Sequence, residues 1–420
     1  MINLKNNSRL ITICLSILVL ISFVYSFISG EDSLGKAEHD YIQNNIFLFS
    51  FSENFNLAIQ KYGTYGEVRN LPTFNIIFSQ FIKLGVEISS LKYLNLLILI
   101  LLIYYFLKSL EIKYKNLSQN GKILFCCIIL LSPTIRSLVN FTYPYLWALC
   151  FFVISIFFYL NFKYYENNKL KNASYCILYL VITSYITPNF SVFIIIFLFD
   201  FFKEFKLSKS FFQICFFSFI LSLPALSFLI WKDFYIFKND VFAMEYAEKF
   251  NISNKIVIIT SIISLFFIPY LTKLNLKEIF LSIKSKNLFY ISFFFLFCIL
   301  FFNFKPGAGG GIFYQFSNLV FDNNFFLFFI FFISLLLFIS AGLYNVKNFI
   351  LFISLILYNL QYTIYYKYFD PLLLFIFLFL ANIKRNNDFD INDLSKKYFV
   401  FYILFLLLNI FKDDVRFLLI

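Results

Sequence analysis

Long apolar runs, separated by short lysine-bearing segments, constrain this chain more than any other feature of its sequence. The first run covers 10–29, and similar runs recur as far as 398–411. Hydrophobic residues make up 61% of the chain and charged residues 14%, and the mean hydropathy is +0.80. Soluble domains are about 45–50% apolar and about 25% charged. Too little polar surface is left to cover a soluble core, so the sequence predicts an all-α polytopic membrane protein.

We expect about 13 transmembrane helices, within a range of roughly 11 to 14, because some apolar runs are shorter than a standard crossing. They would form a single transmembrane domain over 1–420. The run 10–29 follows Lys5 and Arg9, as a signal peptide would, but it is long for one and has no small-x-small cleavage site, so it is predicted as the first span. The predicted spans are 10–29, 89–110, 123–136, 140–160, 173–187, 189–202, 210–231, 255–272, 287–304, 325–343, 349–366, 371–383 and 398–411.

Lysine placement orients these spans. The run 71–84, opened by Pro72, would be about 21 Å long as a helix, too short for a hydrocarbon core of about 30 Å. We predict an interfacial or re-entrant helix there, and the short basic loops that follow then alternate onto the cytoplasmic side. The N-terminus is cytoplasmic in this topology. The predicted outer segments are 30–88, 136–140, 187–188, 232–254, 305–324 and 367–370.

Charge and cysteine placement exclude other classes of protein. The net charge of +12 is carried mostly by lysines in short loops, as orientation in a membrane requires, so no nucleic-acid partner is expected. The seven cysteines all lie inside apolar runs, where a free thiol behaves as a small hydrophobe. No disulfide, metal cluster or thiol catalysis is expected from them.

The stretch that follows the first predicted span is rich in ionisable residues. Glu31, Asp32, Glu38, His39 and Asp40 fall within ten positions of a chain that has 23 acidic residues and one histidine. Ionisable groups at a membrane edge are candidates for function. The alternative is an ordinary solvated loop. We interpret loop 30–88 as the catalytic loop of a membrane enzyme.

Two apolar stripes later in this loop have helical spacing. Ile42, Ile46 and Phe49 form the first stripe, and the second is Phe55, Ile59 and Tyr62. Spacings of i, i+4 and i+7 favour helices that lie in the interface with one face toward lipid.

The order of these elements resembles the GT-C superfamily of membrane glycosyltransferases, which includes protein O-mannosyltransferases and aminoarabinose transferases. The resemblance covers about residues 10–110: one helix, an acidic outer loop with interfacial helices, and then RNLPTFNIIFSQFIKLG, with Asn70-Leu71-Pro72 where relatives often have His-Pro-Pro. SPTIRS and YYKYFDP show a looser likeness. The resemblance implies transfer of a sugar from a polyprenyl-phosphate donor to a glycan, lipid or protein acceptor, on the outer face of a bacterial inner membrane.

In such a reaction a carboxylate takes the proton of the acceptor hydroxyl as general base. The resemblance favours an acid just before an interfacial helix, which here is Asp40 before a helix expected from Tyr41. Asp32 and Glu38 are the other candidates. For each of these acids the alternative is a structural role as a helix N-cap or first-turn residue.

The remaining site predictions concern charge on the substrate. Glu31 and His39 are candidates for substrate binding beside the base. No cofactor is expected, although carboxylates around His39 would suit a hard divalent cation such as magnesium. A cation should stabilise the leaving lipid phosphate. The candidates are Arg69, Arg136, Lys305 beside the glycine cluster of 305–324, and Lys367.

Two other functions fit part of the pattern. An O-antigen-type polysaccharide polymerase or ligase would carry a large basic outer loop late in the chain, whereas the longest outer loop here is the first and is acidic. A lipid-linked sugar flippase or transporter would show internal repeats and charges at mid-membrane. Charges inside the predicted spans, such as Lys92 and Asp200, lie near the ends instead.

Overall fold

The computed structural model is helical in every element it describes. It describes residues 4–34, 37–63, 70–238, 251–271, 285–305, 309–339, 342, 345–359, 363–383 and 390–411. Within these residues there is no β-strand, which confirms the all-helical prediction. The chain divides into two compact units, Met1–Glu245 and Tyr246–Ile420, and each is described by itself.

Unit 1 contains the predicted catalytic loop. Its longer helices are α1 (Leu4–Ser29), α2 (Ala37–Glu53), α5 (Lys92–Lys113), α6 (Gln119–Leu131), α8 (Pro144–Tyr164), α9 (Lys169–Ile186), α10 (Ile194–Phe205) and α11 (Lys209–Trp231). Its shorter ones are α3 (Phe55–Lys61), α4 (Thr73–Lys83), α7 (Pro133–Asn140) and α12 (Tyr235–Lys238), with 3₁₀ turns at Ile88–Leu91 and Pro188–Phe193.

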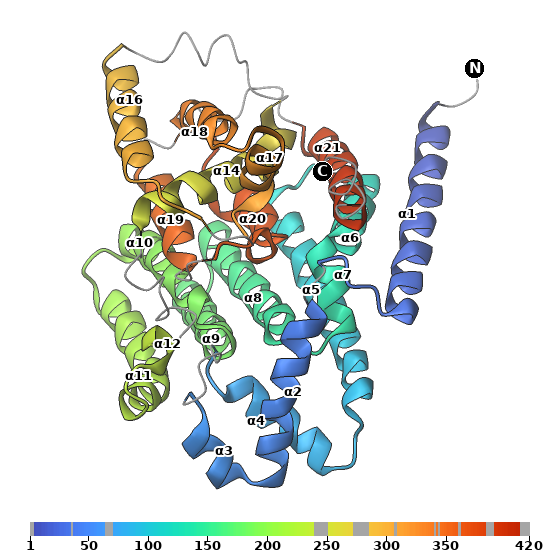
Figure 1. Ribbon diagram of the computed structural model, residues 1–420, viewed down its shortest axis with the longest axis vertical. Helices are drawn as coiled ribbons and strands as arrows, with labels where there is room; N and C mark the ends of the chain where they lie inside the picture. Colours follow the sequence, from blue (N-terminus) through green and yellow to red (C-terminus); the bar gives the residue numbers. More distant parts are fainter. Residues whose placement is uncertain are drawn as a thin grey trace. The chain divides into compact units, whose positions relative to one another are not determined.

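Helix α8 lies at the centre of unit 1. It packs against α9 and α5, and most of its side chains are buried. Helix α1 instead runs along α6 and α7 at the side of the unit (Figure 1). It exposes large apolar side chains such as Leu10, Leu18 and Ile28. Such a surface is stable only in an apolar solvent, as expected for a helix facing lipid.

Helix length and composition also indicate a membrane protein. Five helices among the described residues are long and apolar enough to cross a bilayer, or six if the bent pair α6–α7 is one span. The five are Arg9–Ser29, Ile88–Lys113, Pro144–Tyr164, Lys209–Trp231 and Ile252–Leu271. Helix α4 has 11 residues, about 16 Å at 1.5 Å per residue, so the prediction that this stretch is too short to cross upright is confirmed.

Segments that the lysine pattern assigns to one face of the membrane contact each other in unit 1. On the predicted outer face, the hydroxyl groups of Tyr62 and Tyr235 donate to the carbonyl oxygen of Asn70, at 3.1 and 2.6 Å. On the predicted inner face, Lys169 and Glu204 form an ion pair at 2.5 Å. These contacts agree with the predicted alternation of the intervening segments.

Helices α2, α3 and α4 gather at one end of unit 1 (Figure 1). The first predicted lipid-facing stripe is exposed, at 55% for Ile42, 62% for Ile46 and 49% for Phe49. The second stripe is wrong at Tyr62, which is 2% exposed. Its ring packs against Phe51 and Tyr235, because the chain after α11 returns to cover this side of α3.

Unit 2 is built around α14 (Ile252–Leu271), which contacts most of the other helices of the unit. These are α16 (Ser285–Leu300), α17 (Gly311–Phe321), α18 (Phe325–Phe338), α19 (Val346–Tyr358), α20 (Leu372–Phe375) and α21 (Ile391–Ile410). A 3₁₀ turn at Tyr366–Tyr368 precedes α20, and a π-helical stretch, Ile376–Leu380, follows it.

Gly63 should be essential for the closure of α3 against the segment after α11. Its φ is +83°, and a Cβ atom there would lie 2.6 Å from the Tyr235 ring. Gly85 has nearly the same φ, +84°, but open space around it. Gly85→Ala should therefore lower the free energy of unfolding through backbone strain alone, by about 1–2 kcal/mol. Gly63→Ala should cost about 1–3 kcal/mol more through crowding. Thermal unfolding in detergent measures both, and equal losses would contradict the packing described.

Cysteine labelling tests the orientation of unit 1. Asn56, in α3, and Asn167, between α8 and α9, are both exposed but belong to opposite predicted faces. A membrane-impermeant maleimide should label Asn56→Cys in intact cells, and Asn167→Cys only after permeabilisation. Wild-type protein reports the background from the native cysteines. The reverse labelling pattern would place the catalytic loop in the cytoplasm.

Candidate functional site

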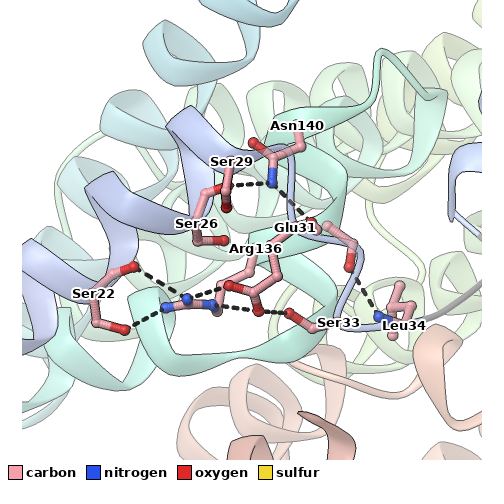
Figure 2. A network of polar contacts seen from close by, with 9 residues as sticks. Ser22, Ser26, Ser29, Glu31, Ser33, Leu34, Arg136 and Asn140 are labelled. Atoms are coloured by element: carbon pink, nitrogen blue, oxygen red, sulfur yellow. Dashed lines mark hydrogen bonds and ion pairs between the residues drawn. The ribbon is translucent and has the colours of Figure 1, made fainter.

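A polar network joins the end of α1 to α7 (Figure 2). The guanidinium group of Arg136 donates two hydrogen bonds to the carboxylate of Glu31, from Nη2 at 2.7 Å and from Nε at 3.3 Å. It also donates from Nη1 to the Ser22 hydroxyl at 3.3 Å and from Nη2 to the Ser22 carbonyl at 3.1 Å. Arg136 is 3% exposed, so this network is a buried fastening between two segments far apart in sequence.

Arg136 does not lie in an outer turn, as the sequence predicted for 136–140. Ser132 caps a new helix, accepting from the backbone N–H of Ile135 at 3.2 Å, and Pro133 occupies its first turn. Proline favours this position, since its missing N–H has no helical partner there. The chain therefore bends by 61° and continues as α7 through Asn140. All of α7, Arg136 included, is buried.

Two further side chains of α7 hold the segment after α1. The Asn140 amide donates to the carbonyl oxygens of Ser26 at 3.1 Å and Glu31 at 2.9 Å, as Figure 2 shows. The Ser137 hydroxyl accepts from the backbone N–H of Leu34 at 3.0 Å. The path of residues 31–34 is therefore set by hydrogen bonds to α7. The sequence analysis missed both residues, because asparagine and serine inside an apolar run carry no pattern of their own.

A buried asparagine fixes α7 on its other side. Asn95 of α5 donates to the carbonyl oxygens of Leu138 and Val139 at 3.3 Å, and its own oxygen accepts from the Trp147 indole at 3.0 Å. Asn95 is 0% exposed, so these bonds satisfy its buried amide and tie α5 to α7 and α8. The polar network at Arg136 therefore rests on the core of unit 1.

The carboxyl group of Glu31 is held ionised. Burial by itself raises the pKa of Glu31, but hydrogen bonds from Arg136 and Ser33 and the charge of Arg136 outweigh that effect. The pKa of Glu31 is consequently below its ordinary value of 4.5. A paired carboxylate of this kind is a poor proton acceptor, so Glu31 acts as the anchor of Arg136.

Asp32 caps helix α2. One oxygen of its carboxylate accepts from the backbone N–H groups of Ala37 at 2.8 Å and Glu38 at 3.2 Å, and the other accepts from Leu34 at 3.2 Å. Such bonds satisfy amides at the helix start, which have no carbonyl partner within the helix. Asp32 therefore has the capping role that was the alternative to catalysis for this residue.

Helix α2 begins earlier than the sequence predicted. The expected start was Tyr41, with Asp40 just before it, but the helix begins at Ala37. Glu38 and Asp40 are therefore first-turn acids, at the end of the helix where negative charge is favourable. The onset was missed because its cap, Asp32, is five residues away, outside the usual spacing of a capping motif.

Asp40 and His39 have different surroundings. Asp40 is half-buried and lies one turn before Asn44, which is buried and donates to the carbonyl oxygen of Thr142 at 3.4 Å. Residues four apart share one side of a helix. Asp40 therefore lies on the side of α2 that turns toward the segment after α7. His39 is exposed, and its Nε2 lies 3.1 Å from the Gln43 amide nitrogen.

The other predicted phosphate ligands lie in unit 2, apart from Arg69, which falls outside the described residues. Lys305 is exposed, and Lys367 lies 5.4 and 5.6 Å from the ring centres of Tyr365 and Tyr368. The glycine cluster contacts the same segment, since the N–H of Gly310 donates to the carbonyl oxygen of Ile364 at 2.8 Å. The structure therefore brings the glycine loop next to the segment that contains Lys367.

Lys255 is a buried cation that the sequence analysis did not select. It lies in the first turn of α14, is 3% exposed, and its ammonium group donates to the carbonyl oxygen of Asn359. The sequence did not single it out, because a lysine at the start of an apolar run is usually exposed to solvent at the end of a membrane span. Ionisable residues inside membrane helices are often functional, so Lys255 joins the candidates of unit 2.

The described part of the chain offers no cluster of metal ligands. No group of three or more histidine, cysteine, aspartate or glutamate side chains lies close enough there to hold a metal ion.

Comparison with known proteins gives no further assignment: no family model matches the chain, and no curated protein and no solved structure matches it.

Breaking the pair of Glu31 and Arg136 should destabilise unit 1 strongly. Glu31→Gln leaves the buried Arg136 guanidinium without its counter-charge, at a cost of about 3–5 kcal/mol. Arg136→Met leaves Glu31, whose side chain is 22% exposed, and should cost less. The free energy of unfolding that the double variant loses should be smaller than the sum of the two single losses, by about 1–3 kcal/mol. Thermal unfolding at pH 7 measures all three. Lys108→Met, which removes an exposed ion pair with Glu111, is the control and should cost at most about 1 kcal/mol.

The same series has a pH signature. Because the pKa of Glu31 is lowered in the folded state, its stabilisation is complete above 4.5 and is lost as the pH falls through the folded value. Wild-type protein should therefore lose this contribution on acidification below about pH 4.5, and Glu31→Gln should lack it. Additive single costs, or an unchanged acid profile, would show that the pair is not energetically coupled.

Proposed function

We propose that this chain is an integral-membrane glycosyltransferase of the GT-C type. It moves a sugar from a polyprenyl-phosphate donor to an acceptor hydroxyl at the outer face of a bacterial inner membrane. The proposal includes about 13 membrane spans and a cytoplasmic N-terminus, since the lysine pattern requires an outer catalytic loop.

One observation carries the proposal. After the single membrane-length helix α1, the chain forms three short helices, α2, α3 and α4, at one end of unit 1. We call these three helices the platform, and a cluster of acids stands at its start. The platform is attached to α7 by Glu31 and Asn140, and to Thr142 after α7 by Asn44. A rigid, non-spanning platform supports a reaction in which one substrate lies in lipid and the other arrives from water.

The positions of the four acids favour Asp40 as the general base. Glu31 is engaged by Arg136, and Asp32 accepts from three backbone N–H groups. Glu38 is exposed, whereas Asp40 is half-buried at the start of α2. A general base must be held beside its substrate, and α2 holds Asp40 on the side of Asn44, which contacts the segment after α7.

In the proposed step, the Asp40 carboxylate takes the proton of the acceptor hydroxyl. The hydroxyl oxygen forms a bond to the anomeric carbon of the sugar, and the bond from that carbon to the phosphate oxygen breaks. The lipid phosphate leaves with the bonding electron pair. The anomeric configuration inverts because nucleophile and leaving group lie on opposite faces of the sugar.

A cation should receive the charge that develops on the leaving phosphate. Lys305 and Lys367 stay candidates from the sequence alone. The guanidinium of Arg136 already donates to Glu31 and Ser22, so we assign it to the platform. Arg69 stays a candidate from the sequence alone.

Loss of the base should abolish transfer without unfolding the protein. Asp40→Asn should lower the rate about 10²–10⁴-fold, because a general base contributes that much. Full-length protein in nanodiscs is assayed for release of polyprenyl phosphate from a polyprenyl-phosphate sugar, or in cells for loss of a surface glycan at equal protein level. Glu87→Gln, an acid elsewhere in loop 30–88, is the matched control and should keep full activity.

Asp32→Asn separates capping from catalysis, since asparagine caps helices about as well as aspartate. Loss of transfer in Asp32→Asn with full activity in Asp40→Asn would move the base to Asp32. Full activity in both variants would overturn the carboxylate mechanism.

A further inference from the structure

A cavity of about 580 Å³ lies between α2 and α3. Both helices belong to the short-helix end of unit 1 that Figure 1 shows in blue. This volume is within the range of small-ligand sites, roughly 300–1,000 Å³. The lining residues are Gln43, Ile46, Phe47, Ser50, Phe51, Glu53, Asn54, Leu57, Ala58, Lys61 and Tyr62.

The floor of this cavity is rigid. Phe51 and Tyr62 are 0% and 2% exposed, and their ring centres lie 5.7 Å apart. Behind them, Tyr235 packs edge-on against Tyr62 at 5.9 Å and donates its hydroxyl to the carbonyl oxygen of Asn70. A wall supported by a packed aromatic cluster keeps its shape, and a preformed site loses less free energy to ordering when a ligand binds.

The chemistry of the lining selects the ligand class. Aromatic and aliphatic surfaces alternate with hydroxyl and amide groups from Gln43, Ser50 and Asn54. The charged lining residues are one carboxylate, Glu53, and one ammonium, Lys61. This lining has no net positive charge to recognise a phosphate. A hydrocarbon chain would strip water from the polar groups without replacing their hydrogen bonds.

A neutral carbohydrate satisfies both parts of the lining. Its hydroxyl groups donate to and accept from amide and hydroxyl side chains. The carbon-bound hydrogens of a sugar ring provide an apolar face that packs on aromatic rings.

The cavity also adjoins the start of α2. Gln43, at one end of the lining, lies within hydrogen-bond distance of His39, and His39 is next to Asp40 in the chain. From Asp40 to Asn54 the helix extends about 21 Å, at 1.5 Å per residue. A chain of several sugar residues seated in the cavity could therefore extend along α2 toward the proposed base.

We infer that the cavity between α2 and α3 binds a neutral oligosaccharide, which is the acceptor of the transfer reaction. This assignment rests on the proposed glycosyltransferase function, and it specifies a glycan acceptor rather than a protein or a lipid. Oligosaccharide binding itself requires no donor and no catalysis, so it can be tested separately.

Full-length protein in detergent is applied to a printed array of defined neutral oligosaccharides, and the best-retained one is titrated by saturation-transfer NMR. Ser50→Trp fills the cavity, and Gln43→Leu removes its amide at similar size. Each should weaken binding at least 10-fold. Ser52→Trp is the matched control: Ser52 lies on the same helix outside the lining and should bind like wild type. Thermal unfolding checks that every variant is folded.

The outcomes separate the two proposals. Retention of an oligosaccharide that Ser50→Trp and Gln43→Leu both weaken supports the site, and Asp40→Asn should bind it like wild type because binding precedes chemistry. If such binding is found but no sugar is ever transferred, the cavity assignment stands and the glycosyltransferase function fails. Retention of no oligosaccharide, unchanged binding in folded Ser50→Trp and Gln43→Leu, or displacement by farnesyl phosphate overturns the cavity assignment.

Discussion

The ion pair between Glu31 and Arg136 is the interaction on which unit 1 depends most. Helix α1 packs along α6 and α7 and exposes much of its apolar surface, so apolar contacts alone hold it loosely. A buried guanidinium with hydrogen bonds to Glu31 and Ser22 supplies direction as well as attraction. It fixes where α1 ends, and therefore where the acidic segment begins.

The ion pair between Glu31 and Arg136 also sets the surroundings of the other acids in this segment. The carboxylate of Glu31 is used for the ion pair, and that of Asp32 for the start of α2. Two of the four acids in this short segment thus build the platform. Asp40 lies in the first turn of α2, on the side of Asn44, where the platform meets the segment after α7. The same residue types have different surroundings according to the segments that they meet in the folded chain.

The platform also has a role of its own. Because α2, α3 and α4 do not have to cross the bilayer, they can combine an apolar outer stripe with a polar cavity. Ile42 and Phe49 are exposed in the manner of a lipid-facing surface, Gln43 and Ser50 line the cavity, and Ile46 belongs to both. The exposed apolar stripe and the cavity therefore adjoin each other on α2.

The sequence by itself determined the class of protein, because apolar runs of membrane length and lysines in short loops are properties of composition and spacing. It also determined that 71–84 is too short to cross upright, and that several acids follow directly after the first apolar run. It could not decide how each acid is engaged in the folded chain. The partners of Glu31 and Asn44 come from α7 and the segment after it, about a hundred positions away, and the cap of α2 lies outside any standard motif. Only the folded chain sets those distances, since a buried hydrogen bond depends on where two helices meet and not on the spacing of residues within either one.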